Sequence, residues 1–191
     1  AVRTVNFLAT GYLDVGNYQI GPWYNWIFSN ALEGFRLRWD MGTNRHFSKK
    51  VILHGYLAYG FGDRQFKYQA DALYLLNRSP RSYIFAKYSK DIDYGQTYLD
   101  ELSDDNLFAL AIRKNGVPIK FLKTELMQVN LFREWHNGFS INIGSMRKIY
   151  DPLMNLPSKQ LFAGGKGELL NTFEASVQLR FAYLEKFVEN T

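Results

Sequence analysis

The sequence predicts an all-β fold: an antiparallel up-and-down transmembrane β-barrel, of which roughly eight strands would lie in this chain. Apolar and charged residues alternate along extended segments, which is the period of a strand with two different faces. The clearest segments approach about ten residues, the length that a strand needs to cross an outer membrane at a tilt. The aromatic content, 17%, is high and is typical of proteins that place rings at a lipid–water boundary.

The central hairpin, within residues 30–67, carries the strongest alternation. A polar turn at residues 43–50 joins its two strands. One face is apolar, with Phe35, Leu37, Trp39 and Met41 on the first strand and Val51, Leu53, Leu57, Tyr59 and Phe61 on the second. The other face of the first strand carries Arg36, Arg38 and Asp40. In a membrane barrel the apolar face meets lipid and the charged face lines the lumen, whereas a soluble barrel has the reverse arrangement. Periodicity alone leaves both open.

The other elements follow in chain order. We expect extended segments at residues 18–28, 65–76, 82–91, 119–135, 139–144 and 169–184. Two longer polar connections are expected, an acidic excursion at residues 91–106 and a loop with Pro and Gly at residues 150–167. The alternation in residues 119–135 slips, which predicts a β-bulge there.

The last segment repeats the two-faced pattern, with Phe173, Val177, Leu179 and Phe181 on its apolar face and Glu174 and Arg180 on the other. Charges inside a barrel lose hydration unless opposite signs pair. We therefore expect a lumen charge network made of Glu33, Arg36, Arg38, Asp40, Glu174 and Arg180. Such a network is either a gate, a selectivity ring or a plug contact, or it only fills and stiffens the barrel.

Composition and motifs exclude several classes of function. The 191 residues suit one domain, no segment is apolar enough for a spanning helix, and the absence of cysteine excludes disulfides and thiolate metal sites. The net charge is +5, but the basic residues are scattered, so we expect no nucleic-acid partner. His46, His54 and His136 lack a metal-ligand spacing. We expect no metal and no cofactor.

Catalytic motifs are also missing from the sequence. There is no Gly-x-Ser-x-Gly motif, and residues 164–167 lack the pattern of a phosphate-binding loop. An enzymatic reading, with Glu33 and Asp40 as acid and base, has only their shared strand in its favour. We therefore expect no enzyme. The chain opens without a signal peptide, which suggests a processed segment or a fragment.

Several motifs, in order, resemble one protein family. Residues 21–38 read GPWYNWIFSNALEGFRLR, residues 55–63 read GYLAYGFGD, and residues 179–187 read LRFAYLEKF. Between them lie FSKK at 47–50, PRSY at 80–83, DNLF at 105–108 and REWHNGFS at 133–140. Together these resemble the Bacteroidetes outer-membrane proteins that join a carboxypeptidase-regulatory-like domain to a barrel domain of unknown function. Leu32 and Leu184 stand where that family commonly has Val and Gly.

The resemblance implies a location and an architecture, and no biochemical activity. Residues 1–191 would be one section of a single outer-membrane barrel domain, without the N-terminal regulatory-like domain and the last strands. The expected location is the bacterial outer membrane, and the expected partners are outer-membrane lipids and other outer-membrane or periplasmic proteins. The expected role is structural, transport-related or in membrane assembly. The alternative is a soluble β-barrel that binds an apolar ligand inside.

Overall fold

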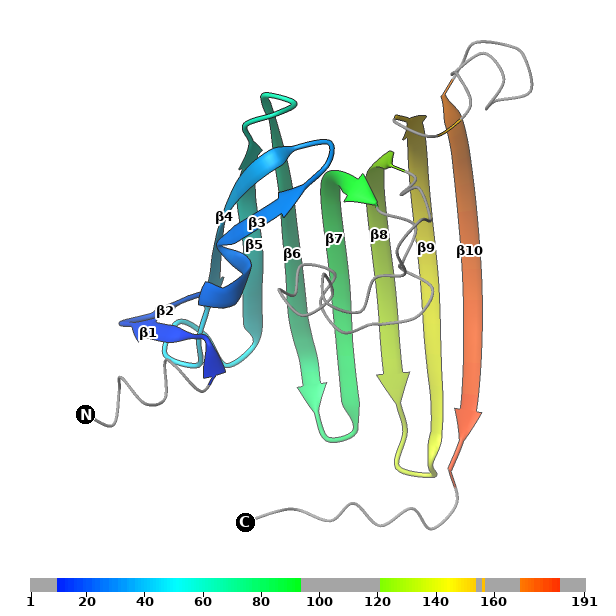
Figure 1. Cartoon of the computed structure of the whole chain (residues 1–191). Helices are drawn as coiled ribbons and strands as arrows, with labels where there is room; N and C mark the ends of the chain where they lie inside the picture. Colours follow the sequence, from blue (N-terminus) through cyan, green and yellow to red (C-terminus); the bar gives the residue numbers. More distant parts are fainter. Residues whose placement is uncertain (1–9, 94–120, 154–155, 157–168, 183–191) are drawn as a thin grey trace.

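The computed structural model describes residues 10–93, 121–153, 156 and 169–182. These residues form an antiparallel up-and-down sheet of ten strands (Figure 1), which confirms the predicted all-β class and strand arrangement. The strands are β1 (Leu13–Val15), β2 (Tyr18–Ile20), β3 (Ile27–Asn30), β4 (Gly34–Thr43), β5 (Val51–Gly60), β6 (Gln65–Arg78), β7 (Arg81–Asp93), β8 (Leu122–Glu134), β9 (Phe139–Pro152) and β10 (Leu170–Phe181).

The sheet is open in the described part of the chain. Its strand order is β1-β2-β4-β5-β6-β7-β8-β9-β10, with β3 pairing with β4 beside this path. Strands β1 and β10 are therefore its two edges (Figure 1). A single 3₁₀ turn, Trp23–Asn25, joins β2 to β3, and no helix in the described ranges is long and apolar enough to span a bilayer.

The two ends of the sheet differ in the length of their connections. At one end, residues 44–50, 79–80 and 135–138 connect the strands β4–β5, β6–β7 and β8–β9. At the other end, residues 61–64 form a short turn between β5 and β6, and the connections β7–β8 and β9–β10 take residues 94–121 and 153–169. We call the first the short-turn end. Its β8–β9 turn uses Gly138 at φ +80°, where a Cβ would overlap the carbonyl oxygen of Ala182, so only glycine fits there.

The two faces of the sheet differ sharply in burial, as the alternation in β4 predicts. The side chains of Arg36 and Asp40 are almost completely buried, at 1% and 0% exposed. Leu37 and Trp39, which alternate with them, are 43% and 52% exposed. Strand pairing extends the two faces across the sheet, because residues directly opposite each other project to the same side. The difference in burial does not reach β10, where the residues of both faces are exposed. We call the two sides the polar face and the exposed apolar face.

The exposed apolar residues shift along the strands from β4 to β10. They centre near Trp39 on β4, which pairs with Leu57 on β5. On β10 they centre on Val177, which lies in one row with Ile143, Leu131, Ile84, Tyr74 and Val51. On β5, Leu57 is level with the centre of the β4 residues and Val51 is level with the centre of the β10 residues. These two positions are six residues apart. The centre therefore shifts by about one residue for each of the six steps from β4 to β10. A stagger of about 3.4 Å for each 4.8 Å between strands corresponds to a tilt of about 35°.

Three details of the predicted elements need correction. Residues 18–28 form two short strands separated by the cis Gly21–Pro22 bond and the 3₁₀ turn, and the short β1 precedes them, so the described strands number ten. The predicted bulge in β8 is wrong, because β8 pairs without a shift with both neighbours. The register shift lies instead between Leu75 and Asn77 of β6. Strand β9 extends to Pro152, past the predicted start of the loop at residue 150.

Other predictions fall on residues outside the described ranges. These are the acidic excursion after Asp93 and most of the loop at residues 150–167. The acidic stretch was predicted to begin at Asp91, but residues 91–93 are the end of β7. Residues 91–93 pair with residues 122–124 of β8, and Asp91 has a charged partner, Arg36, on the polar face.

Candidate functional site

Four of the six charged residues predicted to form a network lie together on the polar face. They are Glu33, Arg36, Arg38 and Asp40, at the start of β4 and along it. Arg36 Nη1 lies 3.4 Å from Glu33 Oε2, and Arg38 Nη2 lies 2.7 Å from Asp40 Oδ1. Arg38 also donates from Nε to Asp40 Oδ2 at 2.9 Å, so this pair is bidentate. Two-point pairing of this kind fixes both side chains.

Glu33 is the carboxylate with the most partners at the β3–β4 turn. Asn30 positions it, since its side-chain oxygen accepts hydrogen bonds from the backbone N–H groups of Leu32 and Glu33, and its Nδ2 donates to Glu33 Oε2 at 2.6 Å. Lys67 of β6 reaches the other carboxylate oxygen at 2.7 Å. Glu33 and Lys67 are 0% and 1% exposed, so this ion pair is removed from water.

Gly60 leaves the space in which Glu33 and Lys67 meet. A Cβ on Gly60 would come closest to Asp63 Oδ1 and would lie 2.7 Å from Lys67 Nζ and 3.0 Å from Glu33 Cβ. Contacts this short displace one of the two partners. Lys67 also pairs with Asp63, which follows β5, so the turn between β5 and β6 completes the surroundings of the ammonium group.

Burial raises the pKa of Glu33, but the positive charge of Arg36 and the hydrogen bonds from Lys67 and Asn30 outweigh it, so the pKa lies below its usual value of 4.5. The carboxylate is therefore ionised at neutral pH. This fits the neighbouring cations, which need a negative partner when they are buried.

Arg36 joins Glu33 to β7. Its Nη1 and Nη2 donate to the two carboxylate oxygens of Asp91, at 3.0 and 2.8 Å. The hydroxyl of Tyr56, on β5, donates a hydrogen bond to the same carboxylate. One guanidinium therefore connects the acids of two strands, and a tyrosine between them adds a further donor.

Tyr56 also links the two halves of the network. The guanidinium carbon of Arg38 lies 3.7 Å from the centre of the Tyr56 ring, a cation–π contact. On the far side of Asp40, His54 Nε2 lies 3.9 Å from Asp40 Oδ1, and His54 Nδ1 lies 3.2 Å from Asp71 Oδ1. The network thus runs across β4, β5, β6 and β7.

Glu174 and Arg180, the other two predicted members, lie on β10 at the opposite edge of the sheet. They pair with Met146 and Ser140 of β9, and both are exposed. Five strands separate β10 from β4, so the described structure does not bring these two residues to the network.

The thirteen apolar residues predicted to face lipid all lie on the exposed apolar face. Register places them there, since the rows of β4, β5 and β10 project to one side. Val51 and Tyr59 are partly covered, and the others are exposed: Phe35, Leu37, Trp39, Met41, Leu53, Leu57, Phe61, Phe173, Val177, Leu179 and Phe181.

Sequence reasoning missed six members of the network described above, which are His54, Tyr56, Asp63, Lys67, Asp71 and Asp91. Tyr56 and Lys67 were both placed on the polar face by alternation, and that position was the available indication. Asp91 was predicted to end the extended segment 82–91 and to begin the acidic excursion, so no role on the polar face was expected for it. Its partner Arg36 is 55 positions away in the sequence, and no local pattern shows such a contact.

The arrangement favours charge pairing over catalysis. Glu33 and Asp40, the two acids of the enzymatic reading, are each held by basic side chains. In the described ranges, no group of three or more His, Asp or Glu side chains is placed to hold a metal ion. The site is therefore a set of buried ion pairs that crosslinks four strands.

Comparisons of the chain with protein-family models, with curated proteins and with solved structures give no match. The family resemblance drawn from the sequence motifs therefore stays a prediction.

Proposed function

We propose that this chain is a wall of an integral outer-membrane β-barrel, in which the exposed apolar face meets lipid and the polar face lines the interior. The observation that carries the proposal is the inverted burial of β4. Arg36 and Asp40 are buried, whereas Leu37 and Trp39 are exposed. A soluble protein places such residues the other way round.

Dimensions support the same proposal. Strands β4 to β10 have 10 to 14 residues, enough to cross an outer membrane when tilted. The stagger of the apolar residues corresponds to a tilt of about 35°, at the lower limit of the range found in membrane barrels. On β10 the apolar row from Phe173 to Phe181 covers about 27 Å along the strand, or about 22 Å after tilting. A lipid-facing band is about 25 Å tall.

The connections are also those of an outer-membrane protein. Such barrels have short turns at the periplasmic side and longer loops outside. We propose that the short-turn end of the sheet faces the periplasm and that its opposite end faces the cell exterior.

We further propose that the charge network is structural. Its carboxylates are paired at hydrogen-bond distance with Arg or Lys, which leaves little ionic surface for a passing solute. The network would fill and stiffen the part of the barrel built from β4 to β7. The alternative, a soluble β-barrel with an apolar ligand inside, requires the apolar row to be enclosed, and the observed burial favours the membrane barrel.

The test is cell fractionation followed by gel electrophoresis of the protein in detergent, with and without boiling. We expect the protein in the outer-membrane fraction, with a change of migration on boiling, because closed barrels resist detergent until heated. A protein found in the soluble fraction, with the same migration in both samples, would overturn the proposal.

A further inference from the structure

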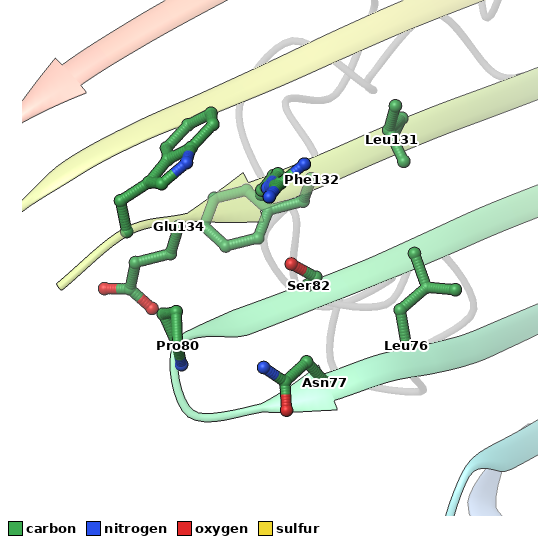
Figure 2. A pocket seen from close by; sticks show the side chains of 9 residues that line it. Leu76, Asn77, Pro80, Ser82, Leu131, Phe132 and Glu134 are labelled. Atoms are coloured by element: carbon green, nitrogen blue, oxygen red, sulfur yellow. The ribbon is translucent and has the colours of Figure 1, made fainter.

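The exposed apolar face holds a groove at the short-turn end that the charge network does not use. Its volume is about 330 Å³, and it lies where β6, β7 and β8 meet. Figure 2 shows Ser82 of β7 between Leu76 of β6 and Leu131 of β8. The groove therefore has apolar sides and a small residue at its centre.

The β6 bulge explains why the groove forms there. The register shift after Leu75 puts Asn77 opposite Ser82, which in turn pairs with Arg133. Leu76 is the extra residue, and it lies beside Asn77 at the groove. Ser82 is much smaller than Asn77 and Arg133, which flank it in its row, so the row is hollow at β7, with Leu76 and Leu131 beside the hollow.

The lining of the groove contains a positive charge beside an aromatic ring and one acidic residue, Glu134, whose carboxylate lies 4.0 Å from Arg81 Nε. The guanidinium carbon of Arg133 lies 5.1 Å from the ring centre of Trp135, and both residues line the groove. Among the described residues, no carboxylate forms an ion pair with Arg133. When the flat face of a guanidinium stacks on an aromatic ring, the N–H groups at the edge of the guanidinium can still bind an anion.

The surrounding end of the sheet is basic. The three short turns with their flanking residues, 43–50, 78–81 and 133–138, contain six Lys or Arg residues and one acid, Glu134. The basic residues are Arg45, Lys49, Lys50, Arg78, Arg81 and Arg133. Positive charge beside an apolar face attracts anionic lipid headgroups.

We propose that this groove binds an anionic phospholipid, with one acyl chain between Leu76 and Leu131 and the phosphate group on Arg133. The inference rests on the proposed membrane location. The apolar sides match a hydrocarbon chain, the guanidinium can hold a phosphate through two hydrogen bonds, and an indole is favoured at the headgroup level. The site is at the short-turn end, so the lipid belongs to the periplasmic leaflet.

The experiment uses the full chain reconstituted in vesicles with equal amounts of phosphatidylglycerol and phosphatidylethanolamine. Insertion is checked first by the change of gel migration on boiling. The lipids that remain bound after extraction in mild detergent are then counted by native mass spectrometry. We expect the wild type to retain about five times more phosphatidylglycerol than phosphatidylethanolamine. This ratio corresponds to the attraction of one basic residue to an anionic headgroup.

Two variants and two matched controls test the assignment. Arg133→Gln should abolish the preference, whereas Arg147→Gln should keep it. Arg147 lies on the same face of β9, about 20 Å along that strand from Ile141, the residue that pairs with Arg133. Ser82→Leu fills the groove without a change of charge and should lower retention of both lipids. Ala86→Leu, on the same face of β7 outside the groove, should not.

The possible failures are distinguishable. A chain that does not insert overturns the membrane proposal and this site with it. If the wild type inserts but shows no lipid preference, the headgroup site alone is overturned. The same holds if the Arg133→Gln variant keeps the preference. Unchanged retention in Ser82→Leu shows that the groove holds no acyl chain and is covered by something else, which overturns the proposal as well.

Discussion

Arg36 on β4 and Asp91 on β7 form a bidentate ion pair across the two strands that lie between them, with N–O distances of 3.0 and 2.8 Å. Neighbouring strands are about 4.8 Å apart, so on a flat sheet the two backbones would be separated by about 14 Å. Two side chains that rise from the same face do not meet over that distance. The pair therefore requires the polar face to be concave, and it ties the curvature of the sheet to its charge pairing.

Removing the cation of this pair should be costly. Arg36→Met leaves Glu33 and Asp91 without their shared partner, and breaking a buried ion pair from one side costs about 3–5 kcal/mol. The free energy of unfolding can be measured by urea titration in detergent micelles, followed by tryptophan fluorescence. The control is Arg81→Met: Arg81 is exposed, its partner Glu134 is 4.0 Å away, and the loss should be less than about 1 kcal/mol. Equal losses in both variants would contradict the role of burial.

Acid should weaken the network through Glu33. The pKa of Glu33 is lowered in the folded protein, because Arg36, Lys67 and Asn30 together outweigh the effect of burial. Its contribution to stability is therefore complete above the ordinary value of 4.5 and is lost as the pH falls through the lower folded pKa. The difference in urea midpoint between wild type and Glu33→Gln should shrink from pH 7 towards pH 3. A difference that grows on acidification would rule out this linkage.

Gly60→Ala should disturb the pairing of Glu33 with Lys67. The added methyl group would lie 2.7 Å from Lys67 Nζ, and overpacking of this kind costs about 1–3 kcal/mol. The measurement is a double-mutant cycle with Lys67→Ala, using the same urea titration. Because Lys67→Ala removes one of the clashing atoms, the two costs should not add. Additive costs would show that the methyl group acts elsewhere.

Charge on the exposed apolar face should impair insertion. Trp39→Arg and Leu53→Arg each place a cation where lipid is proposed, at a cost of about 2–4 kcal/mol near the bilayer midplane. The measurement is the fraction folded into vesicles, read from gel migration with and without boiling. His46→Arg, in the exposed β4–β5 turn, is the control and should insert as the wild type does. Full insertion of both strand variants would refute the assignment of this face to lipid.

Much of the fold could be predicted because the strand period is local. The odd-numbered apolar residues of β4 and β5 fix which face each side chain joins, and the structure confirms that hairpin. The network was predictable only along β4 itself. Lys67 and Asp91 reach Glu33 and Arg36 through the pairing and curvature of four strands, and a linear pattern holds no information on either.

The errors also have physical causes. The bulge was expected in β8 because its apolar face carries Lys123 and Glu125, and a charged pair there looked like a shift of face. In the structure both stay on the same side as Met127, and they lie towards the long-connection end of the strand. The apolar residues occupy a different part of each successive strand, so the remaining part of the same side can carry polar residues without any change of register.

The single extra residue in β6 shows how the chain accommodates an insertion. Side chains alternate with a period of two, so one additional residue reverses the side to which every later residue of a strand projects. In β6 it comes after Leu75, and only Asn77 and Arg78 of the strand follow. An insertion at the middle of the same strand would turn Lys67 or Asp71 outwards. Length changes should thus accumulate at strand ends, or arrive two residues at a time.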